Sequence, residues 1–168
     1  TESEYMEMIR LKTSVLPAAA LEIGAVLGDA LQKDSESLYG FGEKMGLAFQ
    51  LQDDWLDVYG NPDVFGKRIG GDILCNKKTY LYIKARELAD VSQNAELDRW
   101  AAFDGDNVQM KIDAVRNIYD ALGVGHLCRE RIVSLFSEAM DCLKSMTVGQ
   151  ERLSVLTGYV NGLINRKI

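Results

Sequence analysis

The apolar residues of this chain recur at helical spacing along most of its length. Val108, Ile112, Val115 and Tyr119 follow one another at steps of three or four, the pattern of a helix with one apolar face. Similar stripes predict helices over residues 3–13, 17–32, 35–59, 125–146 and 150–165. Three further helices are predicted to begin at Asn76, Ser92 and Asp106, the last of them ending at Gly123. No stretch alternates as a strand would, so the predicted fold class is all-α, a helical bundle.

The longest predicted helix carries three acids in an otherwise apolar segment, residues 49–57. The first of these acids is Asp53. With about 100° per residue, Asp57 lies about 40° from it, Gln50 about 60° and Asp54 about 100°. The large apolar side chains fall on the other sides of the helix, which leaves little of its surface for water. The sequence therefore predicts one polar face on a largely buried helix.

The ends and the glycines of this helix complete the prediction. Asp34 is expected to cap its N-terminus, and Gly60 is expected to end it. Gly42 and Gly46 fall on the acidic side and are expected to leave open space above the acids. The preceding helix is rich in alanine and glycine, so neighbouring helices should approach it closely.

Ionised carboxylates on an apolar helix need water or a counter-charge, because burial without partners costs several kcal/mol each. One interpretation is a solvated face. The other is a cavity in which divalent cations neutralise the acids. Carboxylate oxygens with no nearby His or Cys favour a hard ion such as Mg²⁺, completed by water and phosphate. The acids alone leave both interpretations open.

A glycine-rich loop, residues 63–72, directly follows the acidic helix and contains Lys67 and Arg68. Backbone N–H groups and cations in such a loop can wrap an anion. The alternative is an ordinary surface loop. The position of the loop after the acids favours the anion-binding interpretation.

Charge and composition narrow the function further. The net charge of −6 argues against a nucleic-acid partner, which requires a basic footprint. No apolar run of about 18 residues exists, so no membrane span is expected. The three cysteines share no metal-ligand spacing, which predicts reduced thiols in a cytoplasmic protein. The single histidine, His126, has no partner that suggests a catalytic triad or zinc site.

Three motifs together resemble the polyprenyl synthetase family, the trans-isoprenyl diphosphate synthases. Phe49-Gln50-x-x-Asp53-Asp54-x-x-Asp57 resembles the second aspartate-rich motif of that family. The segment from Gly66-Lys67 through Asp72 and Lys77 to Thr79 is similar to the stretch that follows this motif. Upstream, Tyr5 with Lys12-Thr13 resembles the helix that carries the Lys-Thr pair of the family.

The resemblance implies the isoprenoid synthase type of helical bundle and a prenyltransferase reaction. An allylic diphosphate ionises with the help of Mg²⁺, and isopentenyl diphosphate attacks the resulting carbocation. The implied metal ligands are Asp53, directly, and Asp54 and Asp57, through oxygen or water. Lys12 and Lys67 would hold the departing diphosphate.

The remaining implied roles belong to smaller groups of residues. Thr13 and Gln50, with Lys12, form the implied catalytic set, in which the two neutral side chains turn oxygens towards the allylic cation. Asp72 and Lys77 are expected to bind substrate or to close the loop.

The resemblance also implies that residues 1–168 are the C-terminal half of a single synthase domain. No second Asp-Asp-x-x-Asp precedes Asp53, whereas the family carries a first acidic motif upstream. We therefore expect the isolated chain to lack prenyl transfer. Because half a bundle exposes apolar faces, we also expect a homodimer or association with the missing N-terminal half.

Two alternatives remain beside the synthase. A terpene cyclase shares diphosphate ionisation, but the Lys-Thr pair and the Gly-Lys loop argue against it. A non-catalytic helical subunit that retains a diphosphate half-site would usually have lost one of four residues that this chain keeps: Lys12, Asp53, Asp57 and Lys67.

Overall fold

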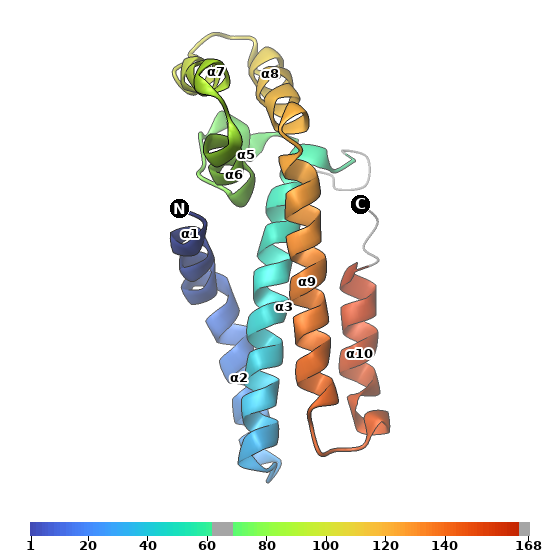
Figure 1. Ribbon diagram of the computed structural model, residues 1–168. Helices are drawn as coiled ribbons and strands as arrows, with labels where there is room; N and C mark the ends of the chain where they lie inside the picture. Colours follow the sequence, from blue (N-terminus) through green and yellow to red (C-terminus); the bar gives the residue numbers. More distant parts are fainter. Residues whose placement is uncertain (62–68, 165–168) are drawn as a thin grey trace. The chain divides into compact units, whose positions relative to one another are not determined.

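The structure is a computed structural model that describes residues 1–61 and 69–164. All regular structure in these ranges is helical, which confirms the predicted fold class. The elements are α1 (Glu2–Ile9), the π-helix η1 (Arg10–Ser14), α2 (Val15–Leu27), α3 (Gln32–Tyr59), α5 (Gly71–Leu74), α6 (Tyr80–Leu88), α7 (Val91–Ala101), α8 (Val108–Ala121), α9 (Val124–Lys144) and α10 (Gln150–Ile164) (Figure 1). Within the described ranges, no helix is long and apolar enough to cross a membrane.

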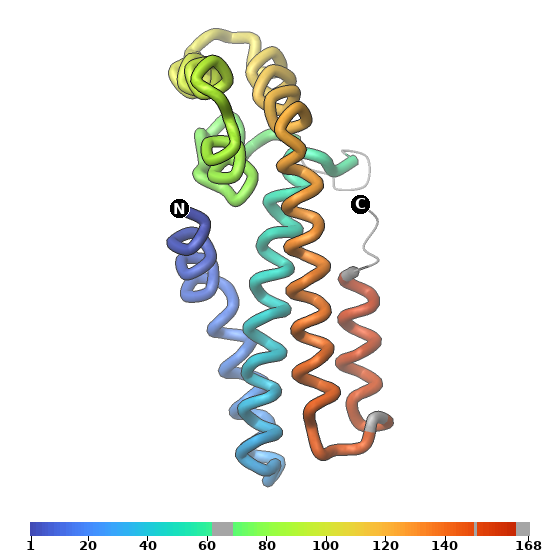
Figure 2. The backbone as a smooth tube through the Cα atoms, viewed as in Figure 1, coloured from blue at the N-terminus to red at the C-terminus, as the bar shows by residue number. Residues whose placement is uncertain are grey.

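The described residues form two compact units. The first unit comprises residues 1–5, 52–61 and 69–129, and the second comprises residues 6–51 and 130–164. The helices α3 and α9 each contribute to both units and are continuous in Figure 2. Each unit is described on its own below.

In the second unit, α2 packs closely on the N-terminal part of α3. A Cβ atom added at Gly42 would lie 2.7 Å from the Cα of Ala18, closer than packed atoms approach. The expectation that the alanine-rich helix permits close approach is therefore confirmed. The expectation that Gly42 and Gly46 leave open space is wrong, because neighbouring backbone fills the space at both glycines.

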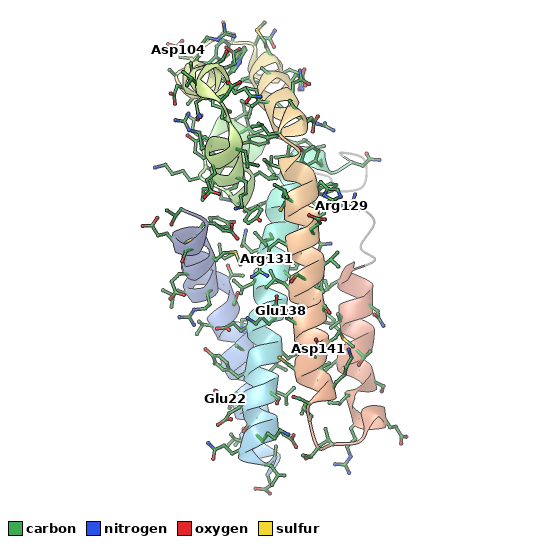
Figure 3. All side chains as sticks on the ribbon, in the orientation of Figure 1. Glu22, Asp104, Arg129, Arg131, Glu138 and Asp141 are labelled. Carbon is green, nitrogen blue, oxygen red and sulfur yellow. The ribbon has the colours of Figure 1, made fainter. Side chains whose placement is uncertain are left out.

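The C-terminal part of α9 also packs against α3 in the second unit. Glu138 Oε2 lies 3.4 Å from Lys44 Nζ of α3. Glu138 Oε1 lies 3.0 Å from Arg131 Nη1 of its own helix, and Figure 3 labels these two residues. Figure 1 shows that α10 returns antiparallel to α9 after residues 145–149. The buried apolar side chains of the two helices include Leu135 and Leu143 of α9 and Leu153 of α10, each less than 5% exposed.

Asp34 does not cap α3, because the helix begins before it, at Gln32. Its carboxylate instead accepts hydrogen bonds from the backbone N of Thr147, at 2.8 Å, and from Thr147 Oγ1, at 2.5 Å. Thr147 follows α9, so Asp34 joins two segments that are distant in the sequence. These hydrogen bonds hold the pKa of Asp34 below the ordinary value of 3.8.

In the first unit, α8 contacts α5, α6 and α7 around buried side chains such as Leu81, Leu97 and Tyr119. The ends of α3 and α9 are joined here by Trp55, whose Nε1 donates to the carbonyl of Gly125 at 3.0 Å. The apolar stripe of α8 thus identifies the core residues Ile112, Val115 and Tyr119 correctly, whereas Val108 is 49% exposed.

The predicted helix starts in the first unit are each displaced. Thr79 caps α6 in place of Asn76, which has a left-handed φ of 51° and lies outside the helix. Asp90 caps α7 in place of Ser92, because its exchange of hydrogen bonds with Gln93 forms a capping box. The N-cap of α8 is likewise Asn107, one residue beyond the predicted Asp106.

We expect Asp34→Asn to lower the melting temperature at pH 7, since the ionised carboxylate accepts both bonds from Thr147. A pKa lowered by folding contributes stability above the unfolded-state value that is lost as the pH falls through the folded-state value. The difference between wild type and variant should therefore shrink below pH 3.8. Thermal unfolding between pH 2 and 7 tests this, with Asp113→Asn as the control for loss of an exposed acid. A constant difference at every pH would contradict the expectation.

Candidate functional site

The three acids of α3 lie in different surroundings. Asp53 is exposed and makes no side-chain hydrogen bond or ion pair with residues 1–61 or 69–164. Asp54 is only 1% exposed. Asp57 is half-buried, and its Oδ2 accepts from the backbone N of Asp72 at 2.8 Å. The predicted single acidic face is therefore wrong for Asp54, which at about 100° from Asp53 falls on the packed side of the helix.

Asp54 is held by two donors from distant parts of the chain. The hydroxyl group of Tyr5 donates to its Oδ2, and Lys77 Nζ lies 3.4 Å from its Oδ1. Burial, followed by the charge of Asp54, raises the pKa of Tyr5, so the hydroxyl stays protonated as a donor. The buried charge of Asp54 is therefore partnered, as a buried charge must be.

Lys77 bridges two acids in the turn before α6. Its Nζ lies 2.9 Å from Asp72 Oδ2 in addition to its contact with Asp54. Burial lowers the pKa of Lys77, but the hydrogen bond to Asp72 and the charges of both acids outweigh burial and raise it. The structure thus brings together the predicted residues Asp54, Asp72 and Lys77.

Asp57 is linked to the same turn through the backbone of Asp72. Burial raises the pKa of Asp57, while the backbone hydrogen bonds from Asp72 and Gly71 oppose the increase. Asp57 therefore positions the start of α5 in addition to any role towards a ligand.

The acids do not form an all-protein metal cage. In the described part of the chain, no group of three or more His, Cys, Asp or Glu side chains is arranged to hold a metal ion. Mg²⁺ usually binds through one or two carboxylates together with water and substrate phosphates. The exposed carboxylate of Asp53 fits that kind of site, whereas both oxygens of Asp54 already face donors of the protein.

The Lys12-Thr13 pair lies on the π-helix η1 in the second unit. The N–H of Val15 donates to the carbonyl of Arg10, five residues back, which defines the wider turn. Buried residues on this stretch are spaced to match it: Ile9 and Ser14 are five apart, and Ala18 follows four later. Single π-turns inside α-helices are frequent at functional sites.

The side chains on this π-helix differ in their exposure and in their contacts. Lys12 is exposed, and Thr13 Oγ1 donates to Gln50 Oε1 at 3.3 Å. The structure therefore brings together two of the predicted site residues, Thr13 and Gln50. A Cβ atom at Gly46 would lie 2.7 Å from the Cα of Ser14, so this glycine lets α3 touch the π-helix. Lys67, the other predicted diphosphate ligand, lies outside the described residues.

Two contacts at the site were not predicted. Tyr5 entered the sequence analysis only through the resemblance, although its hydroxyl partners a buried acid 49 residues away. Asn76 accepts a hydrogen bond from the buried Lys111. Both partners are distant in sequence, so no local pattern indicates them.

The comparisons with known proteins agree on one group of enzymes. A geranylgeranyl pyrophosphate synthase of known crystal structure superposes with a TM-score of 0.88 at 36% sequence identity, covering 99% of this chain and 52% of that one. The short chain isoprenyl diphosphate synthase of Methanothermobacter thermautotrophicus is 31% identical over 160 residues, which are 95% of this chain and 49% of that protein. The geranylfarnesyl diphosphate synthase of Natronomonas pharaonis is 35% identical over 156 residues, which are 93% of this chain and 41% of that protein.

These likenesses define the fold as that of the helical isoprenyl diphosphate synthases. The family model of polyprenyl synthetase matches residues 1–122, a range that includes the Lys12-Thr13 pair and the acids of α3. The chain belongs to the polyprenyl synthetase family, as its sequence motifs predicted. It spans about half the length of the curated relatives that it matches.

We expect Gly46→Ala to destabilise the chain by about 1–3 kcal/mol, because the new methyl group would overlap the backbone of Ser14. Gly24→Ala is the matched control, since a Cβ there meets nothing within 4 Å. In a helix interior this control substitution should stabilise by up to about 1 kcal/mol. Urea unfolding should thus give opposite signs for the two variants, and the same sign for both would contradict the close contact.

We expect Tyr5→Phe to destabilise the chain by about 1–3 kcal/mol, because buried Asp54 loses a hydrogen-bond donor. Tyr159→Phe removes the same hydroxyl from an exposed position of α10 and should have little effect. Chemical denaturation of both variants measures the difference. Equal stability of the two variants would show that the Tyr5 hydroxyl does not support Asp54.

Proposed function

We propose that this chain is part of a prenyltransferase that condenses isopentenyl diphosphate with an allylic diphosphate. The observation that carries the proposal is the family match over residues 1–122, which contains both the acids of α3 and the Lys-Thr pair. The names of the relatives, which are short-chain isoprenyl, geranylfarnesyl and geranylgeranyl diphosphate synthases, support the same reaction class.

Asp53 is the proposed direct Mg²⁺ ligand. Its exposed carboxylate has no protein partner in the described ranges, so both oxygens are available to a hard cation. Asp57 is proposed to contribute through water, because the backbone of Asp72 already uses one of its oxygens. Mg²⁺, when bound, would supply charge neutralisation for the departing diphosphate. Asp54, predicted as a further ligand, is proposed instead to hold Lys77 in place.

The π-helix supplies the proposed groups for the allylic substrate in the second unit. Exposed Lys12 is a cation that can pair with a diphosphate. The hydroxyl of Thr13 donates to Gln50 Oε1, so the oxygen atoms of both side chains lie close together. Oxygen dipoles fixed in advance stabilise a transient cation without reorganising during the reaction. We assign Thr13 and Gln50 this role.

Lys77 and Asp72 are proposed to work as a pair. Because Lys77 is bonded to Asp72 and Asp54, its ammonium group has a fixed position. A fixed cation can pair with a phosphate oxygen that approaches the turn. Lys67 keeps its predicted role in holding diphosphate.

The proposed partners follow from the exposed apolar surface of the second unit. Large apolar side chains are exposed along α1, η1, α2 and the following turn, among them Leu16 at 79%, Ile23 at 58% and Leu27 at 80%. Contiguous surfaces of this kind usually mark protein contacts. We propose a homodimer, or association with the remaining part of the synthase domain, in the cytoplasm.

We expect Asp53→Ala to weaken the Mg²⁺-dependent binding of pyrophosphate by at least about tenfold, equivalent to about 1.4 kcal/mol. The reason is the loss of an exposed carboxylate that can face the cation. Isothermal titration of the full chain with pyrophosphate, in Mg²⁺ and in EDTA, measures the effect.

Asp113→Ala removes an exposed acid of α8 and is the charge-matched control for this titration. It should leave the affinity unchanged. Equal losses in both variants, or binding that persists in EDTA, would contradict the role of Asp53. Absence of any binding by the wild-type chain would contradict the proposed diphosphate site itself.

A further inference from the structure

The turn that carries Lys77 has an unusual backbone. It joins α5 to α6, and Asn76 within it has a left-handed φ of 51°. The N–H of Lys77 donates to the carbonyl of Asp72 at 2.9 Å, and the N–H of Thr79 donates to the carbonyl of Lys77 at 2.9 Å. Asparagine tolerates a left-handed backbone better than most residues, but the conformation still requires support from its surroundings.

Two helices supply that support through the amide of Asn76. Its Nδ2 donates to the carbonyl of Ala101, the last residue of α7, at 3.0 Å. Its Oδ1 accepts from Lys111 Nζ of α8 at 2.9 Å. The amide therefore connects the turn to both helices, and rotation of Asn76 would break both hydrogen bonds.

Lys111 is a costly residue for this position. Lys111 is only 4% exposed, and its ammonium group forms no ion pair with an acid in the described ranges. A buried ammonium group bonded to a neutral amide contributes less to stability than an apolar side chain of similar size would. Stability alone therefore does not explain Lys111, and its contact with Asn76 points to a different role.

The surroundings of Lys111 connect it to the ion pair of Lys77. Lys111, Asn76, Lys77 and Asp72 all line a cavity of about 20 Å³, which has room for one water molecule. The next residue of α8, Ile112, contacts the start of α5, because a Cβ atom at Gly70 would lie 2.7 Å from its side chain. The helix α8 thus contacts the chain on both sides of Asp72, at Gly70 and at Asn76.

The geometry points to Lys111 and Asn76 as positioning residues that hold Lys77 between Asp54 and Asp72. They act through the backbone of the turn and do not touch the substrate. The assignment rests on the proposed function only in giving Lys77 a diphosphate to bind. The predicted loosening of the turn does not depend on any ligand.

The test uses Lys111→Met and Asn76→Gly in the full chain. Methionine keeps the apolar length of lysine, and glycine keeps the left-handed backbone while removing the amide. Hydrogen exchange of the Lys77 and Thr79 amides should become at least about tenfold faster in both variants, equivalent to about 1.4 kcal/mol of local opening. The amide of Val115, in the core of α8, should keep its protection.

Lys84→Met, which removes a lysine of α6 paired with Glu2 and Glu87, is the control and should leave the turn unchanged.

Pyrophosphate titration in Mg²⁺ adds a readout that general destabilisation does not produce. Lys111→Met should weaken binding, whereas Lys77→Met combined with Lys111→Met should bind no more weakly than Lys77→Met alone. Unchanged exchange at Lys77 in both variants, or fully additive losses in the double variant, would overturn the assignment. If the wild-type chain binds no pyrophosphate, the proposed function fails, and the exchange measurement still decides the positioning role.

Discussion

The first unit depends on one buried carboxylate. Asp54 lies on the packed side of α3, and its charge has no access to water. The chain partners it with the hydroxyl of Tyr5, near the N-terminus, and with Lys77, in the turn before α6. Each donor comes from a segment far away in the sequence, so the requirement to satisfy one acid fixes the positions of two others relative to the end of α3. Burial and the same negative charge also raise the pKa of the Cys128 thiol, which therefore stays neutral.

The second unit depends on the close approach of α3 to the backbone of α2 and η1, whereas the first unit depends on a buried charge. Gly42 faces Ala18 and Gly46 faces Ser14, so two helices meet where side chains are nearly absent. This proximity is what allows the hydroxyl of Thr13 to reach Gln50. Small residues in the sequence therefore have a direct chemical consequence, because they bring together two polar groups that a larger neighbour would separate.

The helices and most of the core could be predicted from the sequence, because apolar spacing is a local property that the chain records directly. The long helix is predicted over residues 35–59 and is observed from Gln32 to Tyr59.

The failures of prediction have a common physical cause. Asp34 accepts hydrogen bonds from Thr147, and Asp54 accepts one from Tyr5. Both partners are brought close by the tertiary fold, which a helical wheel cannot predict. Asparagine suits helix caps, so the sequence predicts Asn76 as one, whereas its left-handed backbone and its contact with Lys111 stabilise the turn. The resemblance implies only a shared role for Thr13 and Gln50, and their contact is a finding of the structure, since periodicity alone does not relate two separate helices.

The π-helix sets a limit on how this segment can change. Its wider turn contains one more residue than an α-helical turn, and the buried positions Ile9, Ser14 and Ala18 are spaced to match. Without that extra residue the turn would be an α-helical one, and the first two of these positions, then four residues apart, would still share a face. A deletion inside η1 would therefore remove the π-turn without turning the helix that follows it. A deletion between Ser14 and Ala18 would instead rotate the rest of α2 by about 100° and carry Ala18 away from Gly42.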